Sequence, residues 1–373
     1  MRIGIVREIK DGESRVGLTP SGARQLAGSG HDVIVEAAAG AACGFSDDEY
    51  RAAGAALGSR DEAWASELVV KVKEPLAEEH RFLRGQILFA FLHLAGVSRE
   101  LTSDLLASGT TAVAYETVED EHGRLPLLAP MSAVAGSMAP IVGAYHLARF
   151  NGGSGVLLCR LLGKAYGKVL ILGDGVVGQH AAGVAAAMGA RVVMFGLDAE
   201  HGEQLKRTIS PSLSYEISTP AAVAAQLRDA DLLVGAVLVK AARAPHLVSE
   251  SMVKTMPEGS VIVDVSIDQG GCVETSRPTS HTKPTFVAHG VVHYCVTNMP
   301  GAYPRTSTMA LTEASLPFVQ RIADRGLEVF RSDAALAAGV NTLGGYLTCK
   351  PVAEAFGWHS RYRPLAEVLP DGG

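Results

Sequence analysis

The 373-residue sequence lacks several features that would place it in a membrane, secreted or nucleic-acid-binding class. It has no run of 18 apolar residues, which argues against a membrane-spanning helix. It opens on a predicted strand, Arg2 to Val6, with no signal peptide. The formal net charge is −6, and Lys and Arg form no stripe, so charge gives no case for nucleic acid. We therefore expect a cytoplasmic protein with neither a membrane nor a nucleic-acid partner.

Cysteine is scarce and scattered along the chain. No C-x-x-C pair occurs among Cys43, Cys159, Cys272, Cys295 and Cys349. This spacing fits a reducing compartment, and inert thiols explain it better than a metal site. We predict no metal centre.

A glycine-rich turn stands at the centre of what the sequence does contain. The apolar run Lys168–Leu172 predicts a buried strand, and Gly173-Asp174-Gly175-Val176-Val177-Gly178 follows at once. An Ala-rich helix is expected over Gln179–Met188, ending at Gly189, before a second strand over Arg191–Phe195. G-x-G-x-x-G between a strand and a helix indicates a dinucleotide-binding βαβ unit.

Each glycine of this motif has a physical task in such a unit. Gly173 permits a tight turn, Gly175 lets the backbone approach a pyrophosphate, and Gly178 lets the helix pack closely on the strand. The helix N-terminus then offers N–H groups and a positive dipole to phosphate. A glycine turn in some other α/β protein is the weaker interpretation.

The first 130 residues alternate predicted strands and helices, which implies a parallel sheet covered on both faces. Helices are expected to begin at Thr19-Pro20 and at Ser46, each with a capping side chain. No phosphate motif occurs in this part, so we expect it to hold the substrate. The strands are predicted at Ile3–Val6, Val33–Val35, Leu68–Val72, Ile87–Phe91 and Thr111–Tyr115.

The predicted architecture is α/β, with a Rossmann dinucleotide-binding domain, a discontinuous second α/β domain and a cleft between them. Long helices are expected over Ser132–Phe150 and Thr306–Arg325, and further strands over Leu232–Val237 and Val261–Val265. A helix starting at Ser249 is expected to run to Glu258-Gly259. The C-terminal residues are predicted to be short helices. We expect residues 132–306 to bind the dinucleotide, and residues 1–131 with 307–373 to form the substrate and catalytic domain.

Several polar residues lie where predicted strands end, the edge at which open α/β sheets bind ligands. Arg15 follows the first strand, and its planar guanidinium could clamp a carboxylate, although an exposed loop arginine is the commoner case. Lys73 and His93 end two other strands. Asp268 follows a strand of the dinucleotide domain, and Asn298 lies in a loop that could floor the same cleft.

These segments together resemble the alanine dehydrogenase family and, more distantly, the NAD-binding subunit of proton-translocating transhydrogenase. The resemblance spans essentially the whole chain. Its strongest segments are RIGIVREIKDGESRVGLTP from Arg2, VKVKEP from Val70, GQILFAFLHLA from Gly85, LLAPMS from Leu127, DVSIDQGG from Asp264 and Asn298-Met299-Pro300.

The resemblance implies NAD-dependent oxidative deamination of L-alanine, or a related small amino acid, to the 2-oxo acid and ammonia, in a homohexamer. It implies that Arg15 and Lys73 bind the substrate carboxylate and carbonyl, that His93 is an acid/base residue, and that Asp268 activates water. Met131 and Asn298 would line the substrate. The implied cofactor contacts, together with the glycine motif, are Ser132, Val177, Val237, Leu238 and Ile267.

One departure from the family pattern concerns the cofactor ribose. The family usually has an acid closing the second nucleotide strand, and Gly196 stands there instead. Asp198 lies two residues on and is our candidate for the ribose contact. Because the loop to Glu203 has no arginine for a 2′-phosphate, we expect NAD to be preferred, by roughly tenfold.

Two other functions compete with the dehydrogenase interpretation. A lyase or cyclodeaminase would hold NAD tightly and return the hydride within one turnover, so no NADH would accumulate. An NAD-sensing binding module would not need Arg15, Lys73, His93 and Asp268.

Overall fold

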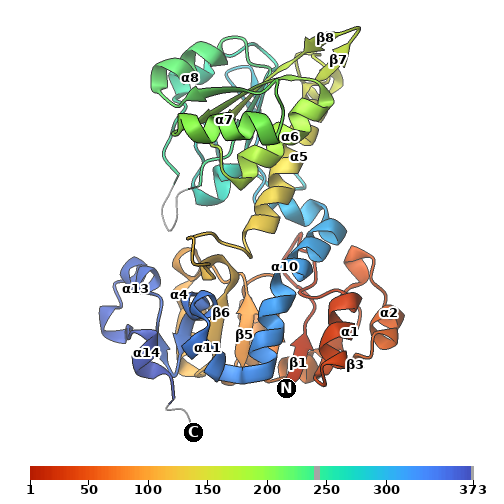
Figure 1. Cartoon of the computed structure of the whole chain (residues 1–373), viewed down its shortest axis with the longest axis vertical. Coiled ribbons are helices and arrows are strands. Elements are labelled where there is room, and N and C mark those ends of the chain that lie inside the picture. The colour runs from red at the N-terminus through yellow and green to blue at the C-terminus, as the bar shows by residue number, and fades with distance from the viewer. Residues whose placement is uncertain (239–243, 371–373) are drawn as a thin grey trace. The chain divides into compact units, whose positions relative to one another are not determined.

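The computed structural model describes residues 1–238 and 244–370. The chain forms two compact units, one of Met1–Met131 with Tyr303–Gly373 and the other of Ser132–Ala302. Each unit is a sheet with helices packed against it (Figure 1). Within the described residues, no helix is long and apolar enough to cross a membrane.

The sheet of the first unit has the strand order β17-β16-β6-β5-β4-β1-β2-β3. The first six strands along the chain pair in parallel, and each strand predicted in this region overlaps one of them. Strands buried on both faces are continuous apolar runs, which is why they could be predicted. The strands are β1 (Arg2–Ile5), β2 (Asp32–Glu36), β3 (Ala56–Gly58), β4 (Leu68–Val70), β5 (Ile87–Ala90), β6 (Thr111–Ala114), β16 (Val340–Leu343) and β17 (Tyr346–Leu347).

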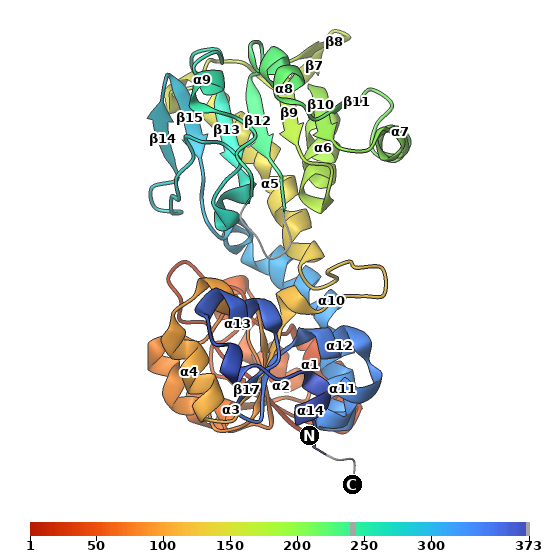
Figure 2. The same cartoon turned by 90° about the vertical axis from the view of Figure 1, so that its left-hand side faces the viewer.

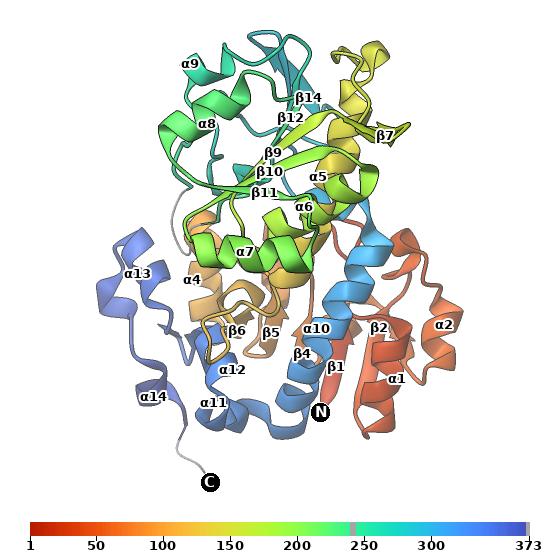
Figure 3. The same cartoon turned by 45° about the horizontal axis from the view of Figure 1, so that its top comes forward.

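Two hydrophobic cores flank this sheet, because successive side chains of a strand point to opposite faces. In β5, Ile87 and Phe89 join one core, and Leu88 and Ala90 join the other. Helix α10 lies beside α1 on the first face (Figure 3). The helices of that face are α1 (Pro20–Gly28), α2 (Asp47–Ala52), α10 (Pro304–Arg325), α11 (Val329–Ser332), α12 (Ala334–Gly339) and α14 (Leu365–Val368); the other face carries α3 (Arg60–Trp64), α4 (Arg99–Ala107) and α13 (Lys350–Phe356).

The C-terminal segment differs from the sequence expectation of short helices alone. β16 pairs antiparallel with β6, and β17 pairs antiparallel with β16. The polar residues of β16 are buried, and the Thr342 hydroxyl donates to the Thr110 carbonyl at 2.8 Å. A four-residue strand with two polar residues at its centre has no apolar run, so the pattern did not reveal it.

The sheet of the second unit has the strand order β11-β10-β9-β12-β13-β15-β14 (Figure 2). All its strands run parallel except β14, which pairs antiparallel with β15. This doubly wound sheet confirms the predicted Rossmann fold. Its strands are β9 (Lys168–Leu172), β10 (Arg191–Gly196), β11 (Ser214–Ile217), β12 (Leu232–Gly235), β13 (Val261–Asp264), β14 (Thr285–Ala288) and β15 (Val291–Tyr294), and a separate hairpin is made of β7 (Cys159–Leu161) and β8 (Lys164–Tyr166).

Helices cover both faces of this sheet as well. Side chains of α5 (Ala129–Leu147), α6 (Val176–Met188) and α7 (Ala199–Thr208) join one core, and those of α8 (Pro220–Leu227) and α9 (Glu250–Val253) join the other. The helix predicted from Ser249 to Gly259 is longer than the helix that the structure contains. It ends at Val253 because the backbone preceding Pro257 is disfavoured in the helical region.

Candidate functional site

The glycine motif of the second unit has close packing that only glycine allows. Gly173 has φ +105°, and a Cβ there would lie 2.5 Å from the Ala236 carbonyl oxygen. A Cβ at Gly178 would lie 2.0 Å from the Gly173 carbonyl oxygen. Gly175 is exposed, a Cβ on it would meet nothing within 4 Å, and α6 begins at the next residue. The loop therefore leaves open backbone at a helix N-terminus, which suits a dinucleotide phosphate.

The helix α5, which carries Ser132, packs tightly on the start of α6. A Cβ at Gly136, one turn after Ser132, would lie 2.3 Å from the Val177 carbonyl oxygen. Ser132 and Val177, both predicted cofactor contacts, are half-buried and belong to these two packed helices.

The loops after β12 and β13 carry the other predicted cofactor contacts and are tied together. The Val237 amide donates to the Ser266 hydroxyl at 2.9 Å, and the neighbouring Ile267 is buried. Leu238 is exposed. Asp264 accepts from the amides of Ser266, Cys272 and Val273 at 3.0–3.3 Å, and burial raises the pKa of its carboxyl.

The predicted catalytic and substrate residues of the second unit lie in short helical loops. Asp268 is exposed in the 3-10 turn Val265–Gln269, directly after β13. Asn298 has φ +58°, in the left-handed region that Asn tolerates better than most residues. Its carbonyl accepts from Gly301 at 2.9 Å, at the start of the turn Met299–Ala302.

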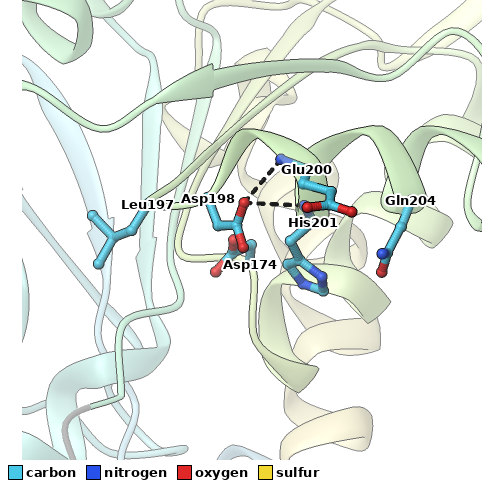
Figure 4. A pocket seen from close by; sticks show the side chains of 6 residues that line it. All are labelled: Asp174, Leu197, Asp198, Glu200, His201 and Gln204. Atoms are coloured by element: carbon cyan, nitrogen blue, oxygen red, sulfur yellow. Dashed lines mark hydrogen bonds between the residues drawn. The ribbon is translucent and has the colours of Figure 1, made fainter.

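At the end of β10, a pocket of about 530 Å³ opens beside the glycine loop (Figure 4). Asp198, the predicted ribose contact, lines it, and its Oδ1 accepts from the amides of Glu200 and His201 at 2.8 and 3.3 Å. Asp198 is thus the N-cap of α7. The residues that line the pocket are Asp174, Leu197, Asp198, Glu200, His201 and Gln204.

In the first unit, Arg15 is almost completely buried, at 2% exposure, which excludes the simple exposed-loop interpretation. Its Nε and Nη2 donate to the two Glu13 oxygens at 2.7 and 2.5 Å, a bidentate pair. Its Nη1 lies 3.0 Å from the Met131 sulfur. The structure therefore brings together Arg15 and Met131, two of the predicted substrate residues.

Lys73 and His93 follow adjacent strands of the same sheet, since β4 pairs with β5 and the Phe91 amide donates to the Val72 carbonyl at 3.0 Å. Glu8 accepts from the amides of both Val72 and Lys73, which fixes the chain at the end of β4.

His93 is exposed and has φ +49°, a conformation that costs free energy for a non-glycine residue and concentrates at functional sites. Glu116 accepts a hydrogen bond from the His93 amide. Burial raises the pKa of the Glu116 carboxyl, and the His93 amide opposes that shift.

Sequence reasoning missed the carboxylates that position these residues. Glu8, Glu13 and Glu116 each bind a segment that carries a predicted site residue. Glu13 lies two residues before Arg15 in the sequence, which was a usable signal. Glu8 and Glu116 bind segments that follow other strands, so the local sequence did not reveal their partners.

The fold and these loops define a two-unit α/β protein, in which the second unit has a Rossmann fold and the first unit carries cationic and titratable side chains at strand ends. No group of three or more His, Cys, Asp or Glu suited to a metal ion occurs within residues 1–238 and 244–370.

Comparison with known proteins gives the family. The N-terminal domain of alanine dehydrogenase/PNT matches residues 4–135, and the C-terminal domain of the same family matches residues 139–350. The chain belongs to the alanine dehydrogenase/PNT family.

Similar proteins cover nearly all of the chain. An alanine dehydrogenase of Halomonas elongata is 51% identical over 96% of this chain and 97% of its own length. One of Bacillus subtilis is 48% identical over 100% and 98%. A solved L-alanine dehydrogenase matches with TM-score 0.93 and 48% identity, over 96% of this chain and 99% of that one. A transhydrogenase of Sinorhizobium meliloti, 24% identical with TM-score 0.80 over 94% and 99%, shares the fold.

Proposed function

We propose that this protein is an NAD-dependent alanine dehydrogenase, which converts L-alanine and water to pyruvate and ammonia, reversibly. The observation that carries the proposal is the identity of about half of all residues, over nearly the full chain, with proteins named alanine dehydrogenase. A lyase or cyclodeaminase is not favoured by these relatives.

The glycine loop and the loops after β12 and β13 would hold NAD, which accepts the hydride from the substrate Cα when bound. Gly173 and Gly178 keep the loop compact, and Val237 and Ile267 lie in segments joined by the Val237–Ser266 hydrogen bond.

Chain residues would supply binding and proton transfer. Arg15 binds the substrate carboxylate and is oriented for it by Glu13, while Lys73 binds the carbonyl or its precursor. His93 takes the proton from the substrate amine, since histidine is the side chain that most often transfers protons in catalysis. Asp268 takes a proton from the water that attacks the iminium carbon. Met131 and Asn298 line the substrate.

The test is a spectrophotometric assay of NADH formation from L-alanine and NAD. His93→Ala and Asp268→Ala should each lower kcat by about 10²-fold or more, the range of general acid–base catalysis, while NADH still binds. If none of the amino acids tested leads the wild-type protein to form NADH, the dehydrogenase assignment is wrong. Near-normal turnover in either variant would remove that residue from its role.

We also propose a homohexamer in the cytoplasm. Association between copies is supported by a stretch of the second unit with exposed large apolar side chains, including Phe150 at 82% and Leu162 at 107% exposure. Isolated monomers rarely leave so much apolar surface in one stretch of chain.

A further inference from the structure

The end of β10 has a feature that the family pattern did not predict. Gly196 stands where an acid usually contacts the adenosine ribose, and the space beside it is filled by two other side chains. A Cβ at Gly196 would lie 2.1 Å from Asp174 Oδ2 and 1.9 Å from the Tyr215 hydroxyl. Glycine is therefore the residue that this arrangement requires.

Asp174 lies inside the glycine motif, between Gly173 and Gly175, but its carboxylate is directed to the end of the second nucleotide strand. The Tyr215 hydroxyl, from β11, donates to Asp174 Oδ2 at 2.7 Å. Burial and this hydrogen bond raise the pKa of Tyr215 to about 12, so the phenol keeps its proton and donates at neutral pH. Asp174 is half-buried, and the hydrogen bond fixes its orientation.

We propose that Asp174 replaces the missing strand-end acid as the residue that accepts hydrogen bonds from the adenosine ribose diol and discriminates against a 2′-phosphate, with Tyr215 as its positioning residue. This inference rests on the proposed use of a nicotinamide dinucleotide.

Asp198, the other candidate for the ribose contact, has a carboxylate that makes different hydrogen bonds. Its Oδ1 caps α7 through two amides (Figure 4). Asp174 instead receives a hydrogen bond from the Tyr215 hydroxyl on Oδ2. Both carboxylates line the pocket, together with Glu200, and none of the pocket's described lining residues is Lys or Arg. A dianionic 2′-phosphate would therefore meet acids without a guanidinium to bind it. The exposed Leu197 gives the same pocket an apolar side that suits a base.

The experiment measures dissociation constants of NADH and NADPH by nicotinamide fluorescence, without amino acid. Asp174→Asn keeps the shape of the side chain and removes its charge. It should weaken NADH binding by about tenfold or more and strengthen NADPH binding, since hydrogen bonds to charged groups have effects of this size. Asp198→Asn is the matched control, because Asn caps helices as well as Asp. It should change the ratio of the two constants much less than Asp174→Asn does.

Two further variants separate recognition from simple damage to the loop. Tyr215→Phe should weaken NADH binding less than Asp174→Asn, because the carboxylate stays but loses its orienting donor. Gly196→Asp alone should abolish binding, because its Cβ would collide with Asp174 and Tyr215. The triple variant Asp174→Ala, Tyr215→Phe, Gly196→Asp returns an acid to the strand end and should regain the preference for NADH.

A changed ratio in Asp198→Asn with no change in Asp174→Asn would overturn the proposal, as would an unchanged ratio in both. Failure of the proposed function is a different result: dinucleotide binding follows the predicted pattern, but L-alanine gives no NADH in the turnover assay.

Discussion

The orientation of the Arg15 guanidinium depends on its buried partner, Glu13. Its guanidinium matches both oxygens of Glu13, and both side chains are nearly or completely buried. A guanidinium has five donors in a fixed fork, so it can pair with Glu13 and still offer donors to a second carboxylate. An ammonium is a point charge and cannot keep both oxygens of Glu13 paired.

We therefore expect Arg15→Lys to raise KM for L-alanine by about tenfold or more, corresponding to ~1.4 kcal/mol, with little change in NADH affinity. Steady-state kinetics and fluorescence titration measure the two effects. Arg7→Lys is the matched control, because Arg7 lies in the same N-terminal segment, is half exposed and pairs with Glu36. An unchanged KM in Arg15→Lys would assign the carboxylate to another cation, with Lys73 the first choice.

For individual residues, the sequence predicted which residue types lie at strand ends but not the hydrogen-bonded pairs that they form. Arg15, Lys73 and His93 could be selected because apolar runs mark where strands end. The pairing of Tyr215 with Asp174 joins residues 41 positions apart through the lateral order of β9, β10 and β11, which no local pattern contains.

Two glycines of the α6 helix differ in how closely other atoms pack against them. Gly178 and Gly183 both lie in α6, but a Cβ at Gly178 would lie 2.0 Å from a backbone carbonyl oxygen, whereas a Cβ at Gly183 would meet nothing within 4 Å. We expect Gly178→Ala to lower the free energy of unfolding by about 1–3 kcal/mol, the range for overpacking, and to weaken dinucleotide binding.

Gly183→Ala should leave binding unchanged and stabilise the protein by up to ~1 kcal/mol, because Ala favours the helix. Urea unfolding and NADH titration of the two variants check both expectations. Equal behaviour of the two variants would contradict the role of Gly178 as the close-packing glycine.

The β15 strand contains a histidine that makes stability depend on pH. His293 is completely buried, its Nδ1 lies 3.0 Å from the Val291 carbonyl oxygen and its Nε2 lies 2.7 Å from the Thr275 hydroxyl. Burial lowers the pKa of His293, so the neutral ring is favoured in the folded protein. Its contribution to stability is present above the ordinary histidine pKa near 6.5 and is lost as pH falls through the lower folded value.

Between pH 7 and pH 5, His293→Gln should therefore lose less unfolding free energy than the wild-type protein. Urea unfolding at a series of pH values measures this slope. His122→Gln, which changes an exposed histidine, should keep the wild-type slope. The same slope in both variants would show that His293 does not contribute.

The elements themselves divide into predictable and unpredictable ones for physical reasons. Parallel strands with a long apolar run, such as β9, and the helix capped at Thr19-Pro20 were predicted, because an apolar run or a cap is local. The parallel strands β3, β11 and β15 were not predicted. The strand β16 was not predicted, because its buried Asn341 and Thr342 donate hydrogen bonds to Thr117 and Thr110, which are distant in the sequence.

The whole molecule leaves an apolar surface on the second unit, between residues 145 and 162. The exposed side chains are Tyr145, Phe150, Leu157, Leu161 and Leu162. If copies of the chain bury this stretch, Phe150→Ser with Leu162→Ser should lower the molecular mass in solution toward that of smaller assemblies. Size-exclusion chromatography with light scattering measures it.

Val287→Ser removes an apolar side chain of 66% exposure from β14 and serves as the control, with no change in mass expected. An unaltered mass in the double variant would place the subunit interface on another surface.

The antiparallel pairing of β16 with β6 has a consequence for how a ribosome-bound chain would fold. The contiguous segment Ser132–Ala302 emerges complete while β6 still presents a bare edge to the surroundings. Unpaired edges invite association with other strands, and multidomain chains are most exposed to it during synthesis. The first unit is thus the first to be synthesised in part and the last to be complete, and its β6 edge is covered only when Val340–Leu343 has been synthesised.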